Sequence, residues 1–224
     1  MVRCSWARTA GGHIARLAAA AAIHIRVLAI GLMIWHRVVL LAGLLLLCGE
    51  RTAFAQAPAP SDSPFAAGRW HAEFATQAAL EAWNYNISHE QLYGLTEGVT
   101  YGLKEGLVLT ATQRIYYVSQ QANDAWVLSV TAGLRKRVYQ RGRLSVFADV
   151  ALGISDTAIA TPPRGTRFNY LAIGSAGTLI RVRPRMYLLS HLQVTHLSNA
   201  SLKGPSRNPD IEAVGVGTGL LLAF

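Results

Sequence analysis

Three residue types that together can hydrolyse an ester lie near the C-terminus of the chain. His196 and Ser198 are separated by a single residue, and Glu212 follows them in the same region. An imidazole can activate a serine hydroxyl as a nucleophile, and a carboxylate can orient and support that imidazole. This chemistry requires the three side chains to meet, so the elements that carry them must be considered next.

A period of two dominates the chain from residue 69 onward. In the segment 143–155, for example, Val146 and Val150 belong to an apolar series that alternates with residues such as Asp149. Such alternation is typical of a strand with one apolar face. We therefore expect eight strands, at approximately 69–83, 94–104, 106–118, 126–139, 143–155, 167–182, 185–198 and 211–224. The segment 69–83 also fits an amphipathic helix, and this alternative stays open.

The expected connections alternate between short and long. Tight links follow the second, fourth and sixth strands, and longer links follow the first, third, fifth and seventh. Outer-membrane barrels show this pattern, with short turns in the periplasm and long loops outside. The last strand ends at Phe224, and a terminal Phe resembles the assembly signal of bacterial outer-membrane barrels. The pattern predicts an all-β fold, an eight-stranded antiparallel transmembrane β-barrel over 69–224, with a periplasmic sandwich or a lipocalin-like barrel as the alternative.

The residues before the barrel have a different composition. An apolar run follows Arg37, and Ala53-Phe54-Ala55 fits a cleavage site, so residues 1–55 are expected to be a signal peptide and 56–68 a flexible lead-in. Met33 is an alternative start of translation. The same region contains both cysteines and part of the formal charge of +9. We therefore expect no disulfide in the barrel and no nucleic-acid partner.

The three candidate residues are expected on the lipid-facing side of the barrel. His196 and Ser198 continue the apolar face of strand 185–198, and Glu212 shares its face with the apolar residues of strand 211–224. Two residues along a strand advance about 6.6 Å, a gap that an imidazole can bridge. Asp210 lies on the same face as Glu212, so it is a rival third member of the triad.

This stretch resembles the lipid A 3-O-deacylases (PagL family) of the Gram-negative outer membrane. The resemblance rests on His196-Leu197-Ser198-Asn199-Ala200, on Asn208 and Pro209 in the following loop, and on Ile211-Glu212 before the closing strand. It implies that Ser198 is the nucleophile, His196 the general base and then acid, and Glu212 the orienting carboxylate. It also implies oxyanion or substrate contacts for Asn199 and Asn208. Two departures are a longer loop before Glu212 and a serine, Ser201, where the family is expected to have glycine.

The resemblance implies hydrolysis of the 3-O-linked acyl chain of lipid A at the cell outer membrane, without a metal or organic cofactor. The partners would be lipopolysaccharide and outer-membrane lipid, and a homodimer stays open. Two other functions are compatible with the residues: a non-catalytic structural or adhesin-like barrel, and a barrel hydrolase acting on phospholipid. The basic residues Arg135, Lys136, Arg137, Arg141 and Arg143 are interpreted as a periplasmic rim.

Overall fold

The barrel consists of eight strands joined in sequence order. The computed structural model describes residues 63–82, 89–204 and 208–224, so the expected signal peptide and the first part of the lead-in lie outside the described residues. The strands are β1 (Trp70–Glu81), β2 (Gln91–Lys104), β3 (Leu107–Ser119), β4 (Ala125–Arg141), β5 (Leu144–Thr157), β6 (Phe168–Arg183), β7 (Met186–Ser198) and β8 (Ile211–Ala223).

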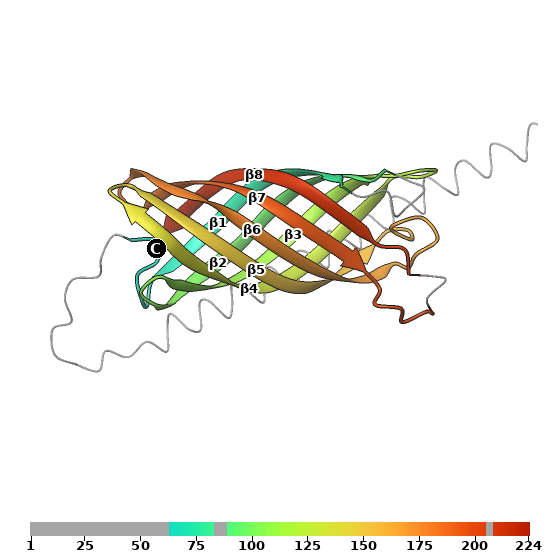
Figure 1. Cartoon of the computed structure of the whole chain (residues 1–224), viewed down its shortest axis with the longest axis horizontal. Coiled ribbons are helices and arrows are strands. Elements are labelled where there is room, and N and C mark those ends of the chain that lie inside the picture. Colours follow the sequence, from blue (N-terminus) through green and yellow to red (C-terminus); the bar gives the residue numbers. More distant parts are fainter. Residues whose placement is uncertain (1–62, 83–88, 205–207) are drawn as a thin grey trace, which may run out of the picture. The chain divides into compact units, whose positions relative to one another are not determined.

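The sheet closes on itself. Each strand pairs antiparallel with the next, and β8 pairs with β1, which leaves no free edge (Figure 1). Closure satisfies the backbone N–H and C=O groups within the sheet, as a barrel in lipid requires. The expected all-β barrel is confirmed, and the segment at 69–83 is a strand rather than a helix. No helix among the described residues is long and apolar enough to cross a membrane.

The strand ends differ slightly from the sequence prediction. The largest shift is at β2, which begins at Gln91 rather than at 94. The polar residues before 94 suggested a loop, but Tyr93 pairs with Ala78 in β1 and with Tyr117 in β3. Pairing on both sides therefore extends this strand beyond its apolar pattern.

The connections alternate as predicted. Three turns of two residues lie at one end of the barrel, which we call the turn end: Glu105–Gly106, Gly142–Arg143 and Pro184–Arg185. The longer connections lie at the other end, the loop end, and the C-terminus returns to the turn end (Figure 1). Both β7 and β8 therefore meet the loop end at the residues that the sequence singled out.

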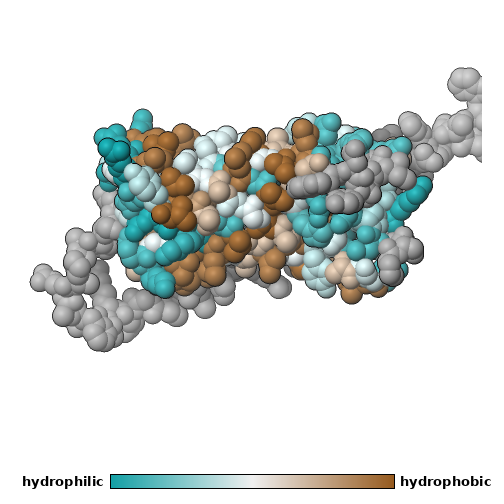
Figure 2. Space-filling model, in the orientation of Figure 1, coloured by the Kyte–Doolittle hydropathy of each residue, from teal (hydrophilic) through white to brown (hydrophobic). Residues whose placement is uncertain are grey.

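The outer wall of the barrel carries the apolar face of each strand. On β8, Val214 and Val216 are exposed, whereas their neighbours Ala213 and Gly215 are buried. Figure 2 shows apolar side chains over the strands, between more hydrophilic residues at the two ends. The face with the apolar residues thus points outward, as expected for a strand in lipid and opposite to a soluble sandwich.

The lumen contains a buried ion network. The guanidinium of Arg135 donates from Nη1 to Glu73 Oε2 at 2.8 Å and from Nε to Asp149 Oδ2 at 3.0 Å. It also lies over the Phe147 ring, 4.7 Å from the centroid. The interpretation of Arg135 as part of the periplasmic rim is therefore wrong. Alternation along β4 turns this residue inward, where it links β4 to β1 and β5.

The described part of the expected lead-in, residues 63–68, packs against the turn end. Phe65 is fully buried and belongs to a core cluster with Val108, Tyr187 and Leu221. The backbone N–H of Gly106 donates to the Phe65 carbonyl at 3.0 Å. The segment just before β1 thus fills this end of the lumen, in contrast to the flexible lead-in that was expected there.

Candidate active site

The register between β7 and β8 places the candidate residues side by side. His196 and Glu212 are directly paired across the two strands. Directly opposed residues of an antiparallel pair have Cβ atoms about 4.5–5.5 Å apart and point to the same face. Ser198 is the last residue of β7, two residues beyond His196, so it lies on this face as well. The outer wall at the loop end therefore holds all three side chains.

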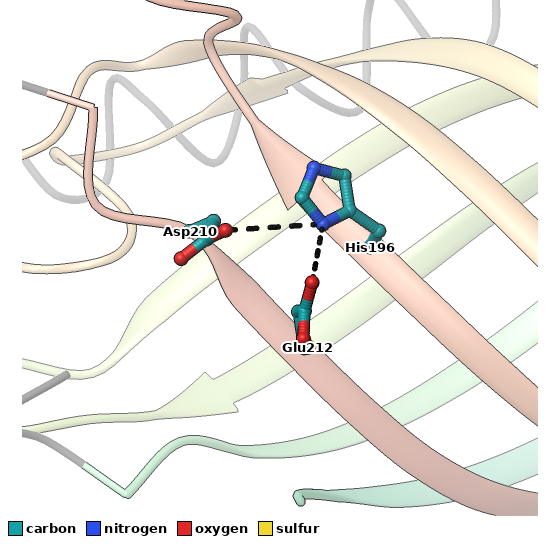
Figure 3. Close-up of side chains that lie close together, drawn as sticks. All are labelled: His196, Asp210 and Glu212. Atoms are coloured by element: carbon teal, nitrogen blue, oxygen red, sulfur yellow. Dashed lines mark ion pairs between the residues drawn. The ribbon is translucent and has the colours of Figure 1, made fainter. Parts of the chain in front are cut away.

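The imidazole of His196 lies between the hydroxyl and the carboxylates. Its Nε2 is 3.0 Å from Ser198 Oγ, and its Nδ1 is 3.4 Å from Glu212 Oε1. Nδ1 is the ring nitrogen to which both dashed lines of Figure 3 run. If Nδ1 carries the proton toward the carboxylates, Nε2 is left to accept the serine proton. The sequence-predicted residues are thus brought together in the order that a serine hydrolase requires.

Asp210 also approaches the imidazole, but from farther away. Its Oδ2 is 4.0 Å from His196 Nδ1, compared with 3.4 Å for Glu212. Figure 3 shows Asp210 just before β8 and Glu212 on the strand itself. Neither distance is within the usual 2.7–3.2 Å range of an N–H···O bond. The shorter distance and the strand position favour Glu212 as the orienting carboxylate.

The burial of the three residues differs. The side chains of His196 and Glu212 are 41% and 34% exposed, whereas Ser198 is only 7% exposed. Polar groups on the outer wall of a barrel are tolerated near its ends, where the cost falls to roughly 0–1 kcal/mol. The imidazole is accessible from the side of the barrel, and the hydroxyl lies beneath the surface.

The residues after Ser198 begin the long β7–β8 loop. The backbone N–H of Asn199 donates to Asn208 Oδ1 at 3.1 Å, which joins the two sides of the β7–β8 loop. Ala200 and Ser201 have φ values of 50° and 62°, in the left-handed region that glycine adopts at the lowest cost. Ser201 is the position at which the resemblance leads us to expect glycine, and its backbone conformation gives a physical reason for that preference.

Two neighbouring residues on β6 were not predicted from the sequence. Tyr170 pairs with Ser198, and Ala172 pairs with His196, with both side chains on the outer wall. Ala172 has a small side chain, and Tyr170 stacks edge-on against Phe168 with ring centroids 5.5 Å apart. No local signal marks these residues, because only the β6–β7 register brings them to the site.

The same carboxylates and imidazole have the donor set of a cation site. One ligand atom from each of His196, Asp210 and Glu212 lies within 4.8 Å of the others. Such a group could hold a divalent cation through one nitrogen and two oxygens. A cation bound there would use the Nδ1 lone pair, and it would therefore compete with the tautomer that carries a proton on Nδ1.

A hollow elsewhere on the outer wall has a volume of about 470 Å³ and does not include these residues. It lies between β8, β1, β2 and β3, and its lining includes Leu95, Glu97, Gln113 and Thr218. Thr218 is six residues below Glu212 on β8, about 20 Å along the strand. The candidate site at the loop end is therefore defined by the positions of its side chains and not by this hollow.

Comparison with known proteins identifies the class of fold. No family model matches the chain, and no curated protein sequence matches it. Among solved structures, Neisserial surface protein A is similar with a TM-score of 0.52 and 10% identity, covering 69% of this chain and 97% of that one. The chain is a closed eight-stranded antiparallel β-barrel, a fold that it shares with Neisserial surface protein A.

Two further structures are similar at lower TM-scores. The outer membrane enzyme PagL gives a TM-score of 0.49 and 17% identity, covering 65% of this chain and 97% of that one. The outer membrane protein OprG from Pseudomonas aeruginosa gives 0.47 and 10%, covering 70% and 96%. At these identities the likeness concerns the fold alone, so an argument for catalysis has to come from the residues of the site.

Proposed function

We propose that the protein is a serine esterase of the Gram-negative outer membrane that hydrolyses the 3-O-linked acyl chain of lipid A. One observation carries the proposal: His196 Nε2 lies 3.0 Å from Ser198 Oγ while Glu212 lies at the other ring nitrogen. This is the arrangement in which an imidazole can take the proton of a nucleophilic serine. The residues and roles are those that the family resemblance implies.

The proposed reaction has two steps. Ser198 Oγ attacks the ester carbonyl carbon as its proton moves to His196 Nε2, and that proton then leaves with the sugar oxygen as the ester C–O bond breaks. Water next attacks the acyl-serine and gives a proton to the same nitrogen, which returns a proton to Oγ as the fatty acid departs. Glu212 supports the imidazolium that forms in each step.

The developing oxyanion needs donors near Ser198. The backbone N–H of Asn199 already donates to an oxygen, Asn208 Oδ1, at 3.1 Å. We propose that the carbonyl oxygen of the substrate replaces Asn208 Oδ1 as the acceptor of this N–H. The side-chain amide of Asn208 would then be available as a second donor.

The wall below the site suits a lipid substrate. Toward the turn end, the outer faces of β7 and β8 continue with exposed apolar residues, Leu192 and Val194 on β7 and Val214 and Val216 on β8. Acyl chains that remain in the bilayer could lie against this surface while the ester reaches Ser198. The loop end of an outer-membrane barrel faces the cell exterior, where lipid A forms the outer leaflet.

The test uses purified protein in detergent, supplied with lipid A or with phospholipid, and measures the fatty acid released. The wild type is expected to release a 3-hydroxy fatty acid from lipid A, and Ser198→Ala is expected to release none above background. Ser190→Ala is the matched control, because Ser190 lies on the outer face of the same strand, six residues or about 20 Å along the strand from His196. Its rate should equal that of the wild type.

Three results would contradict the proposal in different ways. Full activity of Ser198→Ala would remove the assigned nucleophile. Release of fatty acid from phospholipid but not from lipid A would support an esterase but show that its substrate is phospholipid. A folded wild-type protein with no activity on either lipid would favour the alternative function, a non-catalytic structural or adhesin-like barrel.

A further inference from the structure

Basic residues are concentrated at the turn end of the barrel. Five arginines occupy the ends of β4 and β6 and the two adjoining turns, and we call them the turn-end cluster: Arg141, Arg143, Arg181, Arg183 and Arg185. The first of these turns is joined to β6, since the backbone N–H of Arg181 donates to the Arg143 carbonyl at 3.0 Å. The arginines of the β4–β5 and β6–β7 hairpins thus lie on one continuous surface.

Four of the five arginines of the turn-end cluster are exposed and have little neutralising charge beside them. Within the described residues, the carboxylate that lies in a turn at this end is Glu105, and its Oε1 is 2.7 Å from Arg137 Nη1. The cluster's four exposed members, at positions 141, 143, 183 and 185, form no ion pair with a described residue. Like charges on neighbouring turns repel one another, so an anion that binds among them is favoured.

The cluster also surrounds a hollow. A cavity of about 280 Å³ is lined by Arg143, Arg181, Val182, Arg183 and Pro184. A guanidinium presents paired N–H donors that match the oxygens of a phosphate. Three guanidinium-bearing residues around one hollow therefore favour a phosphate group over a diffuse counterion layer.

The apolar residues beside the cluster indicate that the phosphate belongs to a lipid. Ile180 and Val182, on the outer face of β6, are 39% and 45% exposed, and Val138 and Tyr139 are exposed on β4. Cations directly below an exposed apolar wall match the boundary between acyl chains and headgroups. A soluble anion would use the arginines but would leave these apolar side chains without a role.

The opposite end of the barrel has the opposite balance. Described acidic residues at the loop end are Glu81, Glu90, Asp124, Asp156, Asp210 and Glu212, against the basic residues Arg164, Arg167 and Lys203. The arginines of the turn end are therefore not part of a uniformly basic surface. The charge is placed at the end that faces the periplasm, next to the inner leaflet.

We propose that the turn-end cluster binds the headgroup phosphate of an anionic phospholipid in the inner leaflet of the outer membrane. The lipid phosphate lies in the hollow between the two turns, and its acyl chains cover the apolar residues of β6. This site is independent of the proposed esterase, because it lies at the other end of the barrel and shares no residue with it.

The test measures lipid retained by the folded protein in detergent, by native mass spectrometry with equal amounts of phosphatidylglycerol and phosphatidylethanolamine. The wild type should retain phosphatidylglycerol preferentially. The double variant R143Q/R183Q should bind it about thirty-fold more weakly, from the usual contribution of two basic side chains at an anionic lipid surface. R164Q/K203Q, which removes two charges at the loop end, should retain it like the wild type.

Two further measurements complete the test. Heat-modifiable migration on gels shows that each variant is folded, so lost binding is not confused with an unfolded barrel. Added inorganic phosphate should leave phosphatidylglycerol bound; if it displaces the lipid, the site takes a free anion and the lipid assignment is overturned. Equal retention of the two lipids, or unchanged binding by R143Q/R183Q, would also overturn it.

Discussion

Replacing Glu212 by glutamine should cost far more activity than replacing Asp210 by asparagine. Both substitutions remove a charge near His196 while keeping the size of the side chain. The two carboxylates lie 3.4 Å and 4.0 Å from Nδ1. Asp210→Asn is therefore the matched control for Glu212→Gln.

A purely electrostatic role would make the two losses similar. At an effective dielectric constant of about 20, a unit charge stabilises the imidazolium by about 4.9 kcal/mol at the shorter distance and about 4.2 kcal/mol at the longer one. The partial exposure of both carboxylates, 34% and 31%, reduces both values through solvent screening. The difference of about 0.7 kcal/mol corresponds to about three-fold in rate.

If the carboxylate also selects the tautomer of His196, the two variants should lose activity to different extents. An acceptor that moves closer by about 0.5 Å can hydrogen-bond to Nδ1–H, and catalytic hydrogen bonds often tighten in this way when substrate binds. The amide of glutamine can donate to Nδ1 and so stabilise the wrong tautomer; the corresponding change in a serine protease lowers kcat by about 10⁴. We therefore expect Glu212→Gln to lower kcat by about 10²–10⁴ and Asp210→Asn by less than about ten-fold.

The assay is the initial rate of fatty acid release from lipid A in detergent, with kcat and KM determined separately for the wild type and both variants. The effect of Glu212→Gln should appear in kcat, because the imidazolium forms only during the reaction. Equal losses of kcat in the two variants would show that both carboxylates act only through their negative charge. A larger loss for Asp210→Asn would refute the assignment of Glu212 and make Asp210 the third member.

Three predictions concern the stability of the barrel, measured by urea unfolding in lipid vesicles with tryptophan fluorescence. Arg135→Met should lower the free energy of unfolding by about 3–5 kcal/mol, because it leaves two buried carboxylates without their cation; an unchanged midpoint would contradict the lumen network. Gly153→Ala should cost about 1–3 kcal/mol because its added methyl group would overlap the Val130 carbonyl oxygen, whereas Gly174→Ala, with open space around it, should cost nothing. Phe65→Ala should cost about 3 kcal/mol through the cavity it leaves at the turn end, and no loss would show that residues before β1 do not support the lumen.

The local pattern of the chain was sufficient to predict the strands and their faces. Side chains alternate across a strand with a period of two, so an apolar series such as Val214 and Val216 identifies the lipid face from sequence alone. The alternating connection lengths then predicted an antiparallel barrel of the outer-membrane type, since short turns lie at one end of such a barrel and long loops at the other. These features depend on residues that are close together in the sequence.

Several predictions failed or stayed open where distant segments decide the outcome. Arg135 belongs to a basic run in the sequence, but its partners Glu73 and Asp149 are on other strands, so only the closed lumen shows why it is buried. The start of β2 was missed for a similar reason, because the pairing of Tyr93 with its neighbours outweighs its polar surroundings.

The candidate site combines both kinds of information. The sequence by itself placed His196 and Ser198 on one face of a strand, Glu212 on the neighbouring strand and Asp210 just before it. Only the tertiary structure decided which carboxylate is nearer, because that choice depends on the register of β7 against β8. A register is set by pairing along the whole hairpin and by closure of the barrel, and no short stretch of sequence contains that information.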